Sequence, residues 1–307
     1  MSGLGVDVFA ADNAFPGGGG GGGGFSANYG QGLFGDGIEG NATIVGTTSL
    51  TKETYYDNLT ITATGRLKPA GYRFFVKGTL TIDPGGSIDD DGNDPSGITG
   101  GAVLNARNSL GAAGGSGGNG STGGNGSSGG GTGGNSSLND VGLAPLGGKG
   151  GNVPIGNVGG NPGTAPQPVQ GQRYQGSGWN LMSRFTSGTT TVSFNGGSGG
   201  GGGSSSAATV TGGGGGGGAG GVWCAAKTVI NNGRISANGA NGAPGFGTVG
   251  DAGGGGGGGG GFVCVAALSI TGTGTIQALG GLGGAGYNNG DPGANGNGGS
   301  TLVVVLS

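Results

Sequence analysis

Three unbroken runs of glycine constrain this chain more than any other feature. They span residues 17–24, 212–218 and 253–261, and glycine makes up 95 of the 307 residues. A collagen-like triple helix needs glycine at every third position, so solid runs exclude it. Three structures remain open for such runs: a disordered spacer, a surface loop, or an extended threefold helix.

The third possibility orders glycine without a side-chain core. Because glycine has no Cβ, extended chains can approach closely and form lateral hydrogen bonds, whereas a lone chain would leave its N–H and C=O groups unpaired. The sequence has several tracts that could act as mutual neighbours, at 17–24, 114–134, 196–203, 212–221, 253–261 and 280–299. Ordering glycine is entropically costly, so we expect such a bundle to need β-structure or other subunits as a template.

Short apolar runs recur at a fixed spacing between the tracts. Leu59-Thr60-Ile61 recurs 21 residues later as Leu80-Thr81-Ile82, and Gly65-Arg66-Leu67 recurs at the same spacing as Gly86-Ser87-Ile88. Apolar residues at every second position predict half-buried strands. A repeat of this length is typical of one coil of a parallel β-solenoid.

The C-terminal third repeats at about 40 residues. The alignment places three segments in equivalent positions: Val222-Trp223-Cys224, Phe262-Val263-Cys264 and Leu302-Val303-Val304. It also matches three longer segments, residues 77–88, 228–235 and 269–276. On this alignment Cys224 and Cys264 are equivalent, either as two small buried hydrophobes or as a disulfide, which a cytoplasmic assembly site disfavours. Residues 302–306 would form a final interior strand.

These patterns predict an all-β chain of parallel β-solenoid rungs, with inserted glycine-rich tracts that can pack as polyglycine-II helices. Four segments follow from them. Residues 1–35 form an arm and the first glycine tract, and 36–100 form a module of β-rungs. Residues 101–195 are rich in Gly, Ser and Asn with irregular aromatic positions, and 196–307 hold the longer repeats.

The composition argues against several classes of function. The chain has 11 basic and 14 acidic residues and no histidine. Without a basic stripe we expect no nucleic-acid binding, and without histidine the Ser-His-Asp and Cys-His catalytic systems are excluded. No pair of carboxylates stands out for glycoside hydrolysis. We therefore expect no enzyme and no cofactor.

The N-terminal segment and the apolar runs indicate whether the chain is secreted or inserted into a membrane. Residues 1–16 lack both a basic region and a long apolar region, so we expect no secretory signal. No apolar run approaches the roughly 18 residues of a membrane span, so we expect no membrane insertion.

Residues 35–100 resemble a glycine-rich module in predicted tail-fibre and minor tail proteins of tailed bacteriophages. The matching motifs are Gly35-Asp36-Gly37, Ser49-Leu50-Thr51, residues 55–61 (YYDNLTI), residues 71–76 (GYRFFV) and Gly78-Thr79-Leu80. The rest of the chain is similar in composition to phage fibre-tip adhesins, in which packed polyglycine helices form a rigid body and loops touch the bacterial receptor.

The resemblance implies a virion structural protein, assembled in the host cytoplasm and exposed on the particle surface. It would be a tail-fibre or tail-tip component that presents a rigid surface for adhesion. Its expected partners are other virion proteins, further copies of itself, and a host receptor or glycan. Three alternatives stay open: a capsid decoration or head fibre, a surface-glycan depolymerase, and a bacterial cell-surface adhesin.

Two groups of apolar and aromatic residues are candidate contact residues. Tyr174, Trp179, Met182 and Phe185 lie outside the repeats and predict either a capping core or subunit interface, or a receptor contact, as do Phe246 and Tyr287 in the later repeats. Val6, Val8, Phe9 and Phe15 precede the first tract. They form either an arm that docks on another virion protein or a strand of the chain's own fold.

An acidic segment at residues 88–94 (IDDDGND) is a weak candidate for a metal site. Calcium favours oxygen-rich loops with glycine, and Asp89, Asp91 and Asn93 could act as ligands. The segment lacks the EF-hand spacing and its terminal glutamate. It also aligns with the turns at 237–245 and 278–286, so we expect an ordinary solvated turn and no metal.

Overall fold

The structure is a computed structural model that describes residues 33–104, 114–121, 146–154, 158–163 and 196–306. Every element defined within these ranges is a β-strand, and nearly all strand pairs are parallel. The predicted all-β fold with parallel strands is therefore confirmed.

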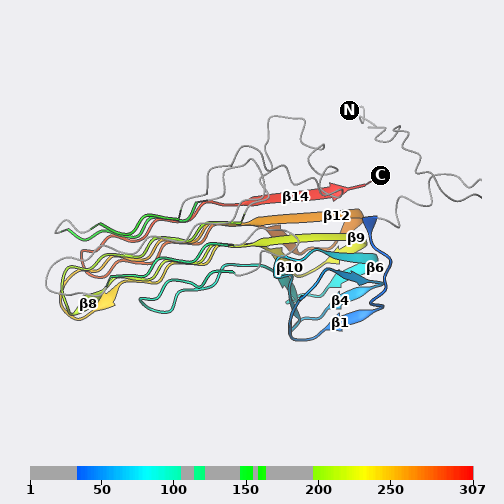
Figure 1. The fold of residues 1–307 in the computed structure, drawn as a ribbon, viewed down its shortest axis with the longest axis horizontal. Coiled ribbons are helices and arrows are strands. Elements are labelled where there is room, and N and C mark those ends of the chain that lie inside the picture. The colour runs from blue at the N-terminus through cyan, green and yellow to red at the C-terminus, as the bar shows by residue number, and fades with distance from the viewer. Residues whose placement is uncertain (1–32, 105–113, 122–145, 155–157, 164–195, 307) are drawn as a thin grey trace, which may run out of the picture.

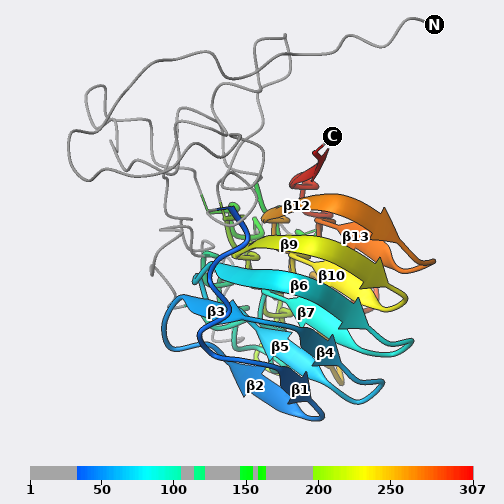
Figure 2. The ribbon, with the colours of Figure 1, turned by 90° about the vertical axis from the view of Figure 1, so that its right-hand side faces the viewer.

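Two parallel sheets face each other at one end of the molecule. The larger sheet has the order β1 (Ala42–Ile44), β4 (Leu59–Ile61), β6 (Phe74–Ile82), β9 (Gly221–Asn231), β12 (Phe262–Thr271) and β14 (Ser300–Val305), with β3 (Thr54–Tyr56) paired beside β6. The smaller sheet has the order β13 (Thr275–Gln277), β10 (Arg234–Ser236), β7 (Ser87–Asp89), β5 (Arg66–Lys68) and β2 (Thr47–Ser49). Figure 2 shows how the chain alternates between the sheets, each pass lying on the one before.

The hydrophobic core between the sheets consists of columns of aliphatic side chains. In the larger sheet Leu59 pairs with Leu80, and Leu80 with Val229. In the smaller sheet Ile88 pairs with Leu67 on one side and Ile235 on the other. All these side chains are fully buried. Alternation along each strand directs them inward, and strand spacing of about 4.8 Å stacks like on like.

The larger sheet is also covered on its outer face, where aromatic side chains gather. The rings of Tyr55 and Phe75 stack at 4.9 Å, and Phe75 lies 5.2 Å from Trp223. Trp223 joins Phe34 and Phe262 in a second buried cluster, separate from the core between the sheets. Burial on both faces explains why residues 221–226 are buried without alternation.

The predicted equivalence of the two cysteines is wrong by one residue. Cys264 pairs with Trp223, whereas Cys224 pairs with Val265. Because neighbouring residues point to opposite faces, Cys224 lies in the core between the sheets and Cys264 lies in the outer cluster. Both cysteines are free, and burial raises the pKa of each thiol, so both are small buried hydrophobes.

The C-terminal segment is not the interior strand that the repeats predicted. β14 begins beside Phe262, with Ser300 rather than Leu302 in that register. It also ends the strand order of the larger sheet, so Val303 and Val305 are 45% and 60% exposed. The segment is an edge strand.

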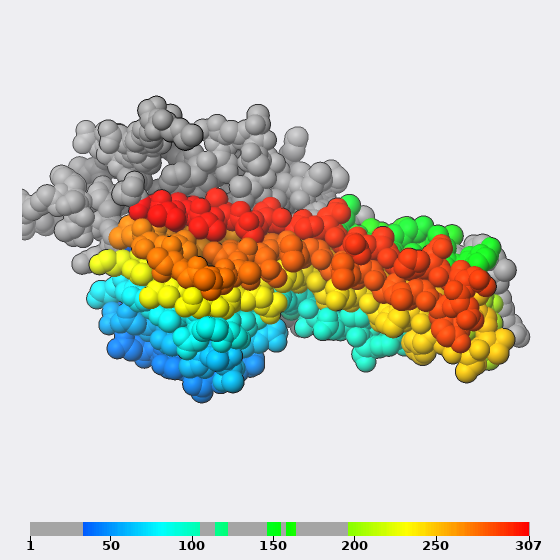
Figure 3. All heavy atoms as spheres, turned by 180° about the vertical axis from the view of Figure 1, so that it is seen from behind, coloured from blue at the N-terminus to red at the C-terminus, as the bar shows by residue number. Residues whose placement is uncertain are grey.

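The glycine-rich tracts leave the sheets and form a long body that extends away from them (Figure 1). The space-filling view shows the coloured layers of the sheets continuing along this body, where green segments from the middle of the chain lie next to the red C-terminal layer (Figure 3). β9 and β12 each continue a glycine tract, 212–221 and 253–261. The body also contains tracts around Gly148 and Gly201, which lie beside 253–261 but, among the described residues, continue into no strand of the two sheets.

Residues 253–261, nine successive glycines, lie buried at the centre of the body. The N–H groups of three successive residues donate to three different tracts: Gly255 to Ala243, Gly256 to Gly201 and Gly257 to Ala294. The next three residues donate to the same three tracts in the same order: Gly258 to Ala240, Gly259 to Ser198 and Gly260 to Asn297. The carbonyl groups accept from three further tracts, through Gly148, Gly216 and Gly284. The central tract thus has six hydrogen-bonded neighbours and a period of three residues.

The spacing of this lattice leaves no room for side chains inside it. A Cβ built on Gly256 would lie 2.0 Å from the carbonyl oxygen of Gly148, and one on Gly215 would lie 2.1 Å from that of Gly200. No real Cβ tolerates such contacts, so the interior positions require glycine. In the described tracts only a few small side chains, such as those of Ser198, Ser204 and Ala219, are fully buried, so a binding site has to form on the surface of the body.

Candidate functional site at the distal tip

The loops that join the glycine tracts meet at the end of the body farthest from the sheets, around β8 (Figure 1). β8 (Val210–Thr211) pairs antiparallel with β11 (Phe246–Gly247). Isolated bridges connect Ala252 to Ser205 on one side and to Tyr287 on the other. Three loops, distant in sequence, are therefore joined through their backbones. We call residues 205–211, 245–252 and 285–291 the distal tip.

Hydrogen bonds of polar side chains hold the three loops of the distal tip together. The N–H of Asp251 donates to Ser206 Oγ at 2.7 Å, and Asp251 Oδ1 accepts from the N–H of Asn289 at 3.1 Å and from its Nδ2 at 3.2 Å. Asn288 Nδ2 donates to the carbonyl oxygen of Gly250 at 2.5 Å. Asp251 thus connects all three loops, and sequence analysis missed it. Its Asn-rich partners were the only signal, and that composition is common in turns.

The structure brings two of the predicted contact residues together at the tip. Phe246 is 45% exposed in β11, and Tyr287 lies in the neighbouring loop, where its hydroxyl donates to the carbonyl oxygen of Thr248 at 3.4 Å. Val249, which the sequence did not single out, is 71% exposed beside them. The remaining candidate residues lie outside the described ranges: Val6, Val8, Phe9, Phe15, Tyr174, Trp179, Met182 and Phe185.

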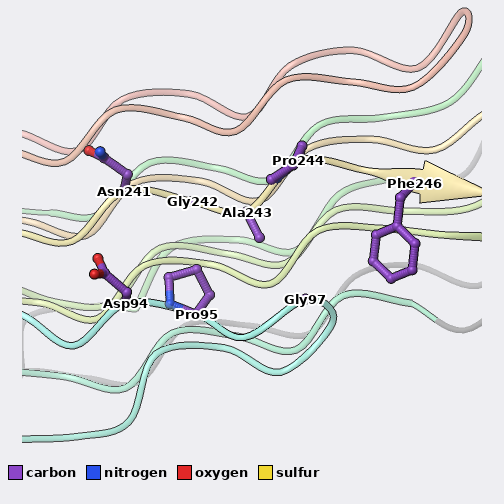
Figure 4. Close-up of a pocket in the computed structure, with 8 residues that line it drawn as sticks. All are labelled: Asp94, Pro95, Gly97, Asn241, Gly242, Ala243, Pro244 and Phe246. Atoms are coloured by element: carbon purple, nitrogen blue, oxygen red, sulfur yellow. The ribbon is translucent and has the colours of Figure 1, made fainter.

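An open groove of about 410 Å³ lies on the flank of the body next to the tip. It is lined by two short segments, residues 94–97 and 241–246. Figure 4 shows the Phe246 ring turned toward the ribbon at Gly97 and the Asp94 carboxylate turned toward the upper segment, with Pro95 between them. Asn241 points away from the groove, where its Oδ1 accepts from the N–H of Leu282 at 2.8 Å. We call this cavity the flank groove.

The predicted solvated turn at residues 88–94 is instead a buried ionic junction between the sheets and the body. Asp89 is fully buried and accepts from Arg66 Nε at 2.8 Å and Nη2 at 2.5 Å. Asp91 pairs with Arg234 at 3.1 Å and accepts from the N–H of Asn238. The segment sits between β7 and the glycine tracts, which explains its burial.

The side chains proposed as weak metal ligands therefore have other partners. Asn93 Nδ2 donates to the carbonyl oxygen of Ala102 at 3.1 Å, while the two aspartates pair with arginines. Among the described residues, no group of three or more His, Cys, Asp or Glu side chains could hold a metal ion.

Asp90 is the most perturbed carboxyl group of this junction. Its Oδ2 accepts from the N–H of Gly221 at 2.9 Å, at the point where a glycine tract becomes β9. Its pKa is raised to about 7, chiefly by burial and to a lesser extent by the charges of Asp89 and Asp91, while the Gly221 hydrogen bond and the charge of Lys68 act to lower it. Asp90 thus connects β7 to the start of the glycine body.

Comparison with known protein families, curated proteins and solved structures found no match to this chain. Within the ranges that the structure describes, no helix has the length and apolar character needed to cross a bilayer.

Proposed function

We propose that this chain is a structural and adhesive virion protein of a tailed bacteriophage, a tail-fibre or tail-tip component. In this proposal the sheets are the rungs of a β-solenoid, and the glycine tracts are polyglycine-II helices packed against one another. Its partners are other virion proteins, further copies of the chain and a receptor or glycan on the host surface.

One observation carries the proposal: a lattice whose interior glycines leave no room for a Cβ ends in three loops that are hydrogen-bonded together and carry exposed apolar residues. The three-residue rotation of hydrogen bonds around residues 253–261 supports the polyglycine-II assignment, because that helix has three residues per turn and no internal hydrogen bonds. Phe246 and Val249 are exposed at the end of this body.

Such an arrangement suits adhesion because the contact residues are held in place before binding. A long body keeps the tip away from the sheets, and hydrogen bonds through Asp251 hold the loops together. Less conformational entropy is then lost on binding than with mobile loops. The function is presentation of a fixed surface.

Immunogold labelling of intact virions tests this proposal. Antibodies raised against the purified chain are applied to tailed particles from the same source, with pre-immune serum as the control. We expect gold at the tail end. Gold on the head alone would identify a capsid decoration, and gold on bacterial cells without any on particles would identify a cellular adhesin. Either result would overturn the proposal.

A second assay addresses the enzymatic alternative. The purified chain is incubated with surface polysaccharide of the host, and new reducing ends are measured over time. We expect none above the heat-denatured control. Sustained release would identify a depolymerase instead.

A further inference from the structure

We propose that the flank groove binds a short neutral oligosaccharide segment of a surface glycan, with Phe246 as the stacking platform at one end and Asp94 as the hydrogen-bond acceptor at the other. This inference rests on the adhesive function proposed above and names the class of ligand. Nothing in the resemblance assigned a ligand to this flank of the body.

The apolar part of the groove is a flat surface on a fixed backbone. Phe246 is 45% exposed, and its ring lies 3.9 Å from the position that a Cβ of Gly97 would take. Pro95 and Pro244 add two rigid rings, and Ala243 and Gly242 complete the lining. Aromatic faces bind ligands that have one apolar side and one wet side. A pyranose has this character, with C–H bonds on its face and hydroxyl groups at its rim.

The polar part of the groove supplies an acceptor. Asp94 is exposed, and none of the ion pairs found among the described residues includes it. An ionised carboxylate has two oxygens that accept hydrogen bonds and no proton to donate. Asp94 lies at the other end of the groove from Phe246, so it suits the hydroxyl groups of a sugar unit that follows the one stacked on Phe246. The volume of about 410 Å³ falls within the range of small-ligand sites, roughly 300–1,000 Å³.

The backbone around the groove argues against a peptide strand as the ligand. At the middle of the 241–246 wall the backbone groups already bond within the lattice: Ala243 donates to Gly214 and accepts from Gly255, and Gly242 donates to Leu282. Strand addition needs a sheet edge with free backbone groups. Recognition here must rely on side chains, which favours a ligand rich in hydroxyl groups.

Binding to an array of oligosaccharides released from bacterial surface polysaccharides tests the proposal. We expect the wild-type chain to bind a subset of neutral oligosaccharides. Phe246→Ala should weaken this binding at least tenfold, and Asp94→Ala about tenfold, because a hydrogen bond to a charged group is lost. Asp94→Asn keeps an acceptor and should lose less. Leu279→Ala, which changes a 56% exposed side chain outside the groove, is the matched control and should bind as wild type.

Three outcomes would overturn the proposal. These are no bound oligosaccharide, binding that survives Phe246→Ala, and binding that Asp94→Asn abolishes and salt weakens, which would identify a cationic ligand. The lattice itself is checked by the circular dichroism spectrum and melting curve of each variant. Tail labelling without glycan binding would leave the adhesive function standing and remove the groove. Glycan binding without virion labelling would leave the groove standing as a sugar site and would remove the proposed role in the virion.

Discussion

At the scale of single residues, the glycine body depends on the absence of a Cβ atom at its interior positions. Nearly every interior glycine faces a neighbouring carbonyl oxygen at a distance that no Cβ could occupy. Glycine carries a large entropic cost on folding, and here the lateral hydrogen bonds offset it. Replacing an interior glycine by alanine should therefore destabilise the protein far more than the same replacement in an exposed turn of the sheets.

We predict that Gly256→Ala lowers the free energy of unfolding by about 1–3 kcal/mol, because the new Cβ would clash with the carbonyl oxygen of Gly148. Gly46→Ala is the matched control, since nothing lies within 4 Å of a Cβ there. Its effect should stay within about 0.5 kcal/mol. Thermal unfolding of both variants measures the difference, and equal melting temperatures would contradict the close packing of the glycine tracts.

Asp90 gives the molecule a predictable pH dependence. Its pKa is about 7 in the folded protein and about 3.9 in an unfolded chain, so ionisation is less favourable in the folded state. Its contribution to stability is largest below pH 4, falls between pH 4 and 7 and is constant above. The total change is on the order of a few kcal/mol. The raised pKa of Asp91 acts in the same direction.

Asp90→Asn tests this dependence, because asparagine keeps an oxygen for the N–H of Gly221 but cannot ionise. We expect the variant to lose most of the decline in stability between pH 4 and 7. Denaturant unfolding at a series of pH values measures it. A variant whose stability falls with pH as steeply as that of the wild type would show that Asp90 is not the titrating group.

At the scale of strands, the sequence predicted which segments pair more reliably than it predicted their register. In residues 59–88, apolar and polar residues alternate, and the residues aligned at a spacing of 21 are the ones that pair. In β9 and β12 both faces are buried, so alternation is lost and no apolar residue marks the inner face. At residues 222–224 and 262–264 the alignment followed the matching cysteines and slipped by one residue. The alignment of 228–235 with 269–276, in contrast, is confirmed. Buried Asp89 was missed because its partner, Arg66, is 23 residues away.

The Arg66–Asp89 pair should stabilise the smaller sheet, because it joins β5 to β7 with a fully buried carboxylate. Among the described residues, Arg66→Ala leaves that charge with the hydroxyl of Ser87 and the more distant Arg234, 3.9 Å away, and should cost roughly 3 kcal/mol. Lys52→Ala removes the exposed pair with Glu39 and should cost less than about 1 kcal/mol. Urea unfolding compares the two variants. A loss in Arg66→Ala no greater than in Lys52→Ala would contradict a structural role for the buried pair.

At the scale of the whole molecule, the sequence indicated that glycine tracts could pack but not which tracts are neighbours. Identical glycines carry no register information. A signal does exist in the outer tract 237–245 (ANGANGAPG), where every third residue is glycine and the alanines are buried. This period of three matches the central tract, in which every third N–H group donates to the same neighbouring tract. Phe246 and Tyr287 were identified as candidates, but their meeting at one tip depends on the lattice that positions both loops.

The central claim is that the glycine tracts form an ordered, hydrogen-bonded body that carries the tip. Amide hydrogen exchange of the full chain tests it most directly, because exchange slows only where N–H groups are held in stable hydrogen bonds. We predict that the amides of residues 253–261 are protected as strongly as those of β9 and β12. Exchange of these glycines at the rate of an unstructured peptide, while β9 and β12 stay protected, would contradict the account.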